Sequence, residues 1–134
     1  MNLRGHGIDL VENDRIASIL ERHRDRFLER VLTARERAHA ERFKHPIPHL
    51  AGRFAAKEAV MKLLGTGWRG KVAWTDIDVR NDPAGMPEVV LSGECARIAA
   101  AKRIGSIFLS ITHTDHYAAA SAIGVDIGND PAST

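Results

Sequence analysis

The chain is organised around the stretch Arg53-Phe54-Ala55-Ala56-Lys57-Glu58-Ala59-Val60-Met61-Lys62-Leu63-Leu64-Gly65-Thr66-Gly67. Alanine, lysine, glutamate, methionine and leucine dominate it, and all five are good helix formers. Gly65 stands where a left-handed cap would end such a helix. Glu58 and Lys62 are four residues apart and therefore share one helix face. The stretch predicts a partly buried helix that ends in a Gly-Thr-Gly loop.

The Glu58–Lys62 pair has two interpretations. An exposed pair at this spacing is common on solvated helix faces and contributes only about 0.3–0.5 kcal/mol. Beside a buried face and a glycine loop, the same pair could instead hold a metal ion and phosphate groups, because backbone amides of such loops bind anions. Gly-Thr-Gly alone fits many turns. The glycines follow a helix, and no Gly-x-x-x-x-Gly-Lys-Ser/Thr order occurs, so this is neither a dinucleotide-binding fingerprint nor a P-loop.

Composition indicates one globular domain. We expect residues 1–125 to form it and residues 126–134 to be a frayed tail. One cysteine, no apolar run of 18 residues and no signal-peptide core favour a cytoplasmic protein without a membrane partner. Nineteen basic residues are nearly offset by 17 acidic ones, and only 5% of residues are aromatic, which argues against a nucleic-acid partner.

The remaining chain predicts an α+β domain with a mixed, largely antiparallel sheet packed with helices. We expect strands at 3–11, about 74–80, 89–91, 106–112 and 117–125, and helices from 13 or 14, at 34–44, 48–64 and 93–103. Thr33 and Glu36 form a capping box, and Gly105 should end the last helix. The strand at 117–125 is almost wholly apolar, so both of its faces could be covered.

Several polar residues stand where a site could form. Asp9 lies inside an apolar strand, so its charge needs a metal ion or an arginine, unless it caps a neighbouring backbone. Carboxylate oxygens of Asp9 and Glu58 suit Mg²⁺, and Arg53 and Lys62 could neutralise phosphate oxygens. His113 and His116 could bind zinc, but no third ligand with suitable spacing is evident.

The first third of the chain is rich in arginine. Arg15, Arg22, Arg24 and Arg26 lie in or near the first predicted helix. They are either a basic face for an acidic partner or an ordinary solvated helix surface.

Together these motifs resemble one family. The motifs are Gly7-Ile8-Asp9-Leu10-Val11-Glu12 with Arg15-Ile16, Arg53 to Ala59 with Lys62 and Gly65-Thr66-Gly67, Asn81-Asp82 with Gly85 and Pro87, and Ser110-Ile111-Thr112-His113-Thr114 with Tyr117 and Ala118. This set is similar to the short bacterial type of 4′-phosphopantetheinyl transferase, the holo-[acyl-carrier-protein] synthases. One departure is Thr112, where the family often has serine; the hydroxyl is kept.

The resemblance implies transfer of phosphopantetheine from coenzyme A to a serine of apo acyl carrier protein, with release of adenosine 3′,5′-bisphosphate. It implies that Asp9 and Glu58 hold Mg²⁺ and that Glu58 and Lys62 are catalytic. Glu58, or a metal-bound water that it orients, would take the serine proton. The implied coenzyme A-binding residues are Arg53, Lys62, Gly65, Thr66, Gly67, Pro87, His113 and Thr114.

The resemblance also implies partners. Acyl carrier protein is acidic, so Arg15, Arg22, Arg24 and Arg26 would form its docking face in a cytoplasmic enzyme of fatty acid biosynthesis. The family implies a homotrimer with active sites between subunits. Two alternatives stay open: a non-enzymatic module that binds an acidic partner through the arginines, and another magnesium phosphotransferase that uses ATP. The sequence does not indicate which carrier proteins or acyl-coenzyme A species are accepted.

Overall fold

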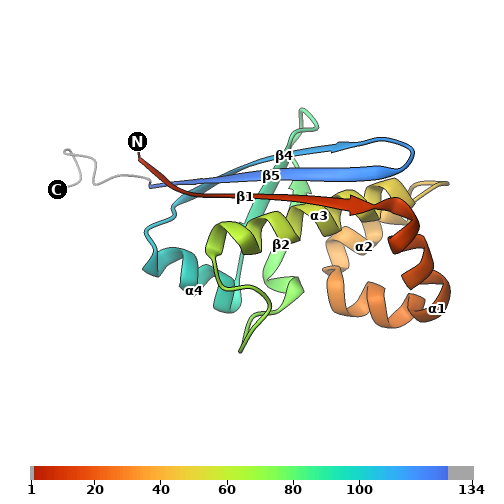
Figure 1. Cartoon of the computed structure of the whole chain (residues 1–134), viewed down its shortest axis with the longest axis horizontal. Helices are drawn as coiled ribbons and strands as arrows, with labels where there is room; N and C mark the ends of the chain where they lie inside the picture. The colour runs from red at the N-terminus through yellow and green to blue at the C-terminus, as the bar shows by residue number, and fades with distance from the viewer. Residues whose placement is uncertain (1, 127–134) are drawn as a thin grey trace.

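The fold is a long helix packed under an antiparallel sheet, seen in a computed structural model that describes residues 2–126. The helix is α3 (Ile47–Leu64), and the sheet runs in the order β1 (Leu3–Glu12), β5 (Tyr117–Val125), β4 (Ser106–His113). A separate hairpin pairs β2 (Ile77–Asn81) with β3 (Pro87–Leu91). Figure 1 shows α3 running along β1 on one side of the larger sheet.

Shorter helices cover the two ends of this layer. Figure 1 shows α1 (Asn13–Val31) and α2 (Ala34–Ala40) at one end and α4 (Gly93–Ala101) at the other. A short 3₁₀ turn, η1 (Trp74–Asp76), leads into β2. The predicted α+β class and the predicted order of helices and strands are confirmed. The strands form two antiparallel sheets rather than one, because β3 and β4 do not share backbone hydrogen bonds.

Small residues bring α3 close to the sheet. A Cβ atom built on Gly7 would lie 1.8 Å from the carbonyl oxygen of Ala59, so only glycine fits there. Ala55 and Ala59 of the helix and Ala118 of β5 are fully buried at this contact. The close approach fixes which residues of α3 stand beside β1, and so places Glu58 and Lys62 near Asp9.

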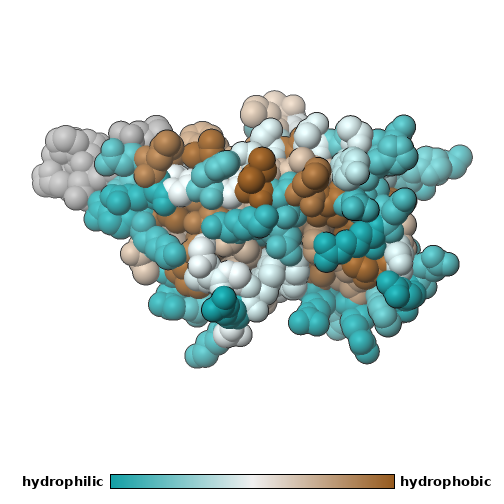
Figure 2. All heavy atoms as spheres, viewed as in Figure 1, coloured by the Kyte–Doolittle hydropathy of each residue, from teal (hydrophilic) through white to brown (hydrophobic). Residues whose placement is uncertain are grey.

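The other face of the sheet is open in the single chain. Its large apolar side chains are strongly exposed: Ile8 59%, Leu10 65%, Phe108 56%, Tyr117 45% and Ile123 37%. Figure 2 shows apolar side chains between polar ones along the side of the molecule that carries this sheet. The expectation that both faces of the strand at 117–125 are covered is therefore wrong for one chain, because its alternate alanines point to α3 and the intervening residues point away.

Some predicted boundaries are also wrong. The helix expected at 34–44 ends at Ala40, and the ring of Phe43 instead stacks on His49 with 3.5 Å between ring centroids. The helix expected at 93–103 ends at Ala101. Arg103, not Gly105, takes the left-handed conformation (φ 61°), and the N–H of Gly105 already bonds to Val125 of the sheet.

The ends of the first helix and of the last strand also differ in detail from expectation. α1 begins at Asn13 after Glu12, and the side chain of Asn13 bonds to the carbonyls of Thr114 and Asp115 instead of capping the helix. α1 is kinked at His23 (φ −143°, ψ 44°). Asp126, expected as the start of a frayed tail, is buried and pairs with Arg4 at 2.7 Å. The rest of that tail, 127–134, lies outside the described residues.

Glu36 does more than cap α2. Its side chain completes the predicted capping box with Thr33, and it is fully buried against the ammonium group of Lys57 at 2.7 Å. Its second oxygen accepts the N–H of Val79 at 2.8 Å, and Lys57 also donates to the carbonyls of Trp74 and Ile77. This buried pair ties α2 and α3 to the start of β2.

Candidate active site

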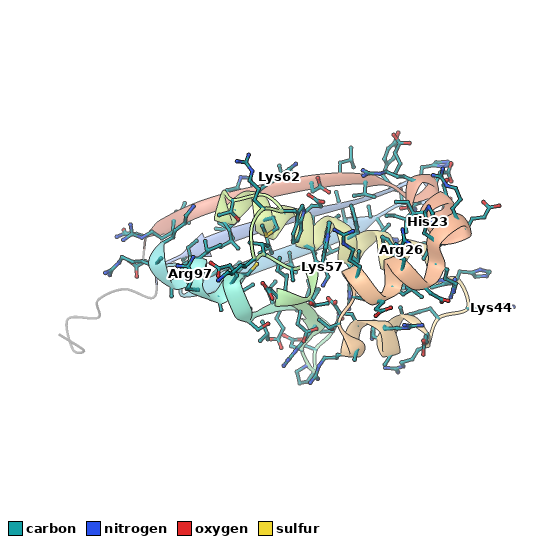
Figure 3. All side chains as sticks on the ribbon, turned by 90° about the horizontal axis from the view of Figure 1, so that it is seen from below. His23, Arg26, Lys44, Lys57, Lys62 and Arg97 are labelled. Carbon is teal, nitrogen blue, oxygen red and sulfur yellow. The ribbon has the colours of Figure 1, made fainter. Side chains whose placement is uncertain are left out.

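The seam between β1 and α3 carries the predicted carboxylate site. Asp9 projects from β1 on the face that α3 covers, and Glu58 and Lys62 lie one turn apart on α3. The ammonium group of Lys62 lies 3.2 Å from a carboxylate oxygen of Asp9 and donates to the carbonyl of Ile8 at 2.9 Å. Figure 3 shows Lys62 beside β1, whereas Lys57 lies inside the molecule. The structure therefore brings Asp9, Glu58 and Lys62 together.

Glu58 is a half-buried carboxylate. Burial raises the pKa of its carboxyl group above the ordinary glutamate range, and the nearby charge of Asp9 acts in the same direction. The hydrogen bond from the indole of Trp68 and the charges of Lys62 and Arg15 oppose this shift in the pKa. Glu58 is thus a carboxylate whose negative charge is only partly compensated by protein groups.

The donors at this seam fit a magnesium ion. Asp9 and Glu58 provide two carboxylates, whose hard oxygen atoms suit Mg²⁺. Residues 2–126 contain no cluster of three or more histidine, cysteine or acidic side chains, so an ion here would need further ligands from outside the chain. Mg²⁺ commonly binds through one or two carboxylates and takes its other ligands from water and substrate phosphates. Asp9 and Glu58 could hold such an ion, and the ammonium group of Lys62 lies beside Asp9, where it could bind phosphate oxygens. The alternative zinc site at His113 and His116 has no third ligand within the same described range.

The Gly65–Gly67 loop starts directly after this seam. Gly65 caps α3 with φ 77°, as predicted, and Gly67 also has a positive φ of 61°. The ammonium group of Lys102 donates to the carbonyl of Leu64 at the end of the helix. The loop is therefore held at its start. Lys102, a cation that the sequence did not single out, lies next to it.

A second group of predicted residues lines a small cavity of about 170 Å³. Arg53, Pro87 and His113 lie there, and Arg53 donates to the side chain of Asn81 at 2.6 Å. Burial lowers the pKa of the Arg53 guanidinium and of the His49 imidazole, and the cations around His49 add to its shift. His49, which the sequence did not single out, lines the same cavity one helical turn before Arg53.

The two groups face different directions. Arg53 and Lys62 are nine positions apart on α3, which corresponds to a rotation of about 180° and a rise of roughly 14 Å. Lys62 turns to β1, whereas Arg53 turns to the β2–β3 hairpin. One chain thus carries the carboxylate seam and the cavity lined by Arg53 on opposite sides of the same helix.

Comparison with known proteins identifies the family. Residues 5–121 match the sequence model of the 4′-phosphopantetheinyl transferase superfamily. The chain is 51% identical over 119 residues to a holo-[acyl-carrier-protein] synthase of Caldanaerobacter subterraneus subsp. tengcongensis, covering 89% of this chain and 92% of that one. The chain belongs to the holo-[acyl-carrier-protein] synthase family. The resemblance noted in the motifs is therefore confirmed, and the chain is a transferase of this class.

Solved synthases share the fold. The holo-[acyl-carrier-protein] synthase of Neisseria meningitidis superposes with a TM-score of 0.86 at 30% identity, covering 93% of this chain and all of that one. A synthase of Bacillus anthracis in complex with CoA (3′,5′-ADP) superposes with a TM-score of 0.77 at 37% identity, covering 92% of this chain and 97% of that one. The similarity in fold extends over nearly the whole chain.

Thr114 differs from Arg53, Pro87 and His113, the predicted coenzyme A-binding residues that line the small cavity. It does not line the cavity of Arg53 and His113. Its hydroxyl accepts the N–H groups of His116 and Tyr117 at 3.2 and 3.0 Å, so it shapes the β4–β5 turn.

The predicted docking arginines of the synthase do not form one flat face. Arg15 lies near the carboxylate seam, with its guanidinium 5.7 Å from the ring centre of Phe54. Arg22 and Arg26 are exposed beyond it on α1, and Arg24 lines a separate hollow with Arg37 and Lys44. Arg15 is close enough to Glu58 for its charge to act on the pKa of that carboxyl group. Across residues 2–126, the structure shows no helix long and apolar enough to cross a lipid bilayer.

Proposed function

We propose that this chain transfers the 4′-phosphopantetheine group of coenzyme A to a serine of apo acyl carrier protein. The observation that carries the proposal is the grouping of Asp9, Glu58 and Lys62 on the β1–α3 seam of a holo-[acyl-carrier-protein] synthase. The coenzyme A in the complex of the B. anthracis relative supports coenzyme A as the substrate.

The proposed reaction is a phosphoryl transfer. The serine oxygen forms a bond to the phosphorus that carries the pantetheine arm, and the bond from that phosphorus to the bridging pyrophosphate oxygen breaks. Adenosine 3′,5′-bisphosphate leaves with the bond electrons, and the serine proton passes to a base. Glu58, or a water molecule that it orients, is the proposed base; burial raises the pKa of the Glu58 carboxyl group above its ordinary value.

Each side chain has a proposed part in binding. Asp9 and Glu58 would hold Mg²⁺, which supplies charge stabilisation for the pyrophosphate when it is bound. Lys62 would exchange its contact with Asp9 for a contact with phosphate oxygens, since its side chain is 55% exposed and free to turn. Arg53 and His113 would bind the 3′-phosphate in the second cavity, and the Gly65–Gly67 loop would border the nucleotide.

A homotrimer would join the two halves of the site. Arg53 and Lys62 point to opposite sides of α3, so the seam of one subunit would meet the cavity of its neighbour. The open sheet face, with Ile8, Leu10 and Phe108 exposed, provides apolar surface for such an assembly. Active sites between subunits follow from this arrangement.

The proposed carrier docks through positive charge. Arg15 lies near the seam, Arg22 and Arg26 are exposed farther along α1, and an acidic acyl carrier protein would be steered toward these charges. The cellular setting that we propose is fatty acid biosynthesis in the cytoplasm.

The test is a change in the mass of the carrier. Purified protein is incubated with apo acyl carrier protein, coenzyme A and Mg²⁺, and the carrier is weighed by mass spectrometry, with Asp9→Ala and Glu58→Ala as variants. A gain of one phosphopantetheine group, absent in both variants and without Mg²⁺, is the expected result. No gain with several apo carriers from a folded protein contradicts the proposal, and competition by ATP would instead indicate a different phosphotransferase.

A further inference from the structure

Trp68 donates its indole N–H to the candidate metal ligand Glu58. The bond runs from Nε1 to Oε1 at 3.1 Å. An indole is a donor only, so it binds one carboxylate oxygen and leaves the other available. Trp68 lies on the loop after α3, which turns back into η1 (Figure 1).

The Trp68 ring packs against a row of aromatic rings that leads into the core. It stacks on Trp74 with 3.7 Å between ring centroids and 21° between planes. Trp74 in turn stacks on the buried ring of Phe54 at 5.0 Å. The carbonyl of Trp74 accepts a hydrogen bond from the buried Lys57 at 3.0 Å. The indole N–H is therefore fixed in space by a row of rings that begins in the interior.

We propose that Trp68 is a positioning residue that orients Glu58 for Mg²⁺. A glutamate side chain loses rotamer freedom when it binds a metal, and a fixed donor on one oxygen removes part of this loss in advance. The other oxygen is left for the ion that Glu58 would share with Asp9. Outer partners of metal-binding side chains change metal affinity or activity by about 10–100-fold in known sites.

This inference rests on the proposed magnesium-dependent transfer and adds a residue to it. None of the motifs that identify the family contains Trp68, which directly follows Gly67 in the sequence. A purely structural role would be to hold the loop through the stack on Trp74. That role needs the ring and not the N–H group, so the two roles can be separated by substitution.

The experiment compares the full-length wild type with Trp68→Phe and Trp74→Phe. Trp68→Phe keeps an aromatic ring against Trp74 and removes the donor, whereas Trp74→Phe changes the same stack and keeps the donor. Mg²⁺ is titrated by calorimetry into each protein saturated with coenzyme A. We expect Mg²⁺ to bind about tenfold more weakly to Trp68→Phe. For Trp74→Phe, whose Glu58 partner is intact, we expect a change of about twofold or less.

Two further readouts distinguish positioning from folding. Saturating Mg²⁺ should restore most of the turnover of Trp68→Phe, with a melting temperature close to that of Trp74→Phe. The chain has two tryptophans, so Trp68 is the sole one in Trp74→Phe. Its emission should change when Mg²⁺ is added, and the emission of Trp68→Phe should not.

Three outcomes overturn the inference. Trp68→Phe could bind Mg²⁺ as tightly as the wild type, or both variants could lose Mg²⁺ affinity equally together with their melting temperature, which would indicate loop folding alone. If the wild type with coenzyme A neither binds Mg²⁺ nor modifies the carrier, the proposed function fails first and the inference fails with it. Wild-type transfer with an unaffected Trp68→Phe variant rejects only the role of Trp68.

Discussion

Helix α3 contributes one lysine to each of two lysine–carboxylate pairs, which have the same charged groups but differ in burial and in hydrogen bonding. Lys57 and Glu36 are both fully buried, with 2.7 Å between the ammonium nitrogen and the carboxylate oxygen. Lys62 and Asp9 lie at 3.2 Å with 55% of the lysine side chain exposed. The two lysines are only five positions apart on the helix. The comparison shows how one helix can carry a buried, fixed pair and an exposed pair that is free to change partners.

Hydrogen bonds explain the difference. Lys57 and Glu36 use nearly all of their polar atoms on each other and on the backbone of residues 33 and 74–79. No ligand can reach them without unfolding the contact. The ammonium group of Lys62 bonds to Asp9 and to the carbonyl of Ile8, and 55% of its side chain is exposed to water. A buried pair loses most of its freedom to change partners, whereas an exposed pair keeps it.

The largest expected effect comes from breaking the buried pair. Lys57→Met leaves the carboxylate of Glu36 buried without its cation, which should cost about 3–5 kcal/mol of unfolding free energy. Lys62→Met, the matched control on the same helix, should cost about 1 kcal/mol or less. Urea denaturation measures both. Equal losses in the two variants would mean that burial does not separate the pairs.

The sequence predicted the residues of the exposed site but not the pair that they form: Lys62 was expected to pair with Glu58, and it bonds to Asp9 of β1 instead. Asp9, Glu58 and Lys62 stood out because a charge in a strand and a pair at helical spacing are local patterns, and Gly65 marked the end of α3 correctly. Lys57 looked like an ordinary helix lysine, and Glu36 looked like a cap, because their pairing joins elements 21 positions apart. The split into two sheets and the reach of Trp68 to Glu58 depend on similar nonlocal packing.

The second prediction concerns function at the exposed pair. Asp9→Asn keeps the size of the side chain and removes one of two charges that would hold Mg²⁺, so carrier modification should fall about 100-fold, since metal stabilisation of phosphoryl charge is worth several kcal/mol. Stability should change by only about 0.5 kcal/mol, because Lys62 stays solvated. Initial rates at fixed Mg²⁺ measure the loss of activity, and urea denaturation curves measure the change in stability. A stable variant with normal rates would place the metal elsewhere.

The third prediction uses the raised pKa of Glu58. Burial raises the pKa of this carboxyl group in the folded chain above its value in the unfolded chain, so the folded state keeps a proton that the unfolded state has lost. Stability contributed by this group therefore falls as pH rises from the unfolded pKa through the folded one. Without Mg²⁺, Glu58→Gln should be more stable than the wild type at pH 7, by about 1 kcal/mol or less for a half-buried group.

Below both pKa values the advantage of Glu58→Gln should disappear, since the wild-type side chain is then protonated as well. Melting curves across pH 4–8, with EDTA present, measure this difference. Asp9→Asn is the control, because it removes one of the charges that raises the pKa of Glu58 without removing Glu58 itself. A Glu58→Gln variant that is less stable than the wild type at pH 7 would show that the ionised carboxylate is already well compensated.

The smallest expected effect sharpens the comparison through salt. Added salt shortens the Debye length from about 8 Å at physiological ionic strength to about 3 Å at 1 M, so it weakens exposed pairs and affects buried pairs much less. Double-mutant cycles for Lys62 with Asp9 should show a coupling energy of about 0.2–1 kcal/mol that shrinks in 0.5 M NaCl. The cycle for Lys57 with Glu36 should give a larger coupling that hardly changes. Screening of both cycles to the same extent would mean that water reaches the buried pair, and the distinction between a fixed and an exchangeable lysine on α3 would then have to rest on geometry rather than on burial.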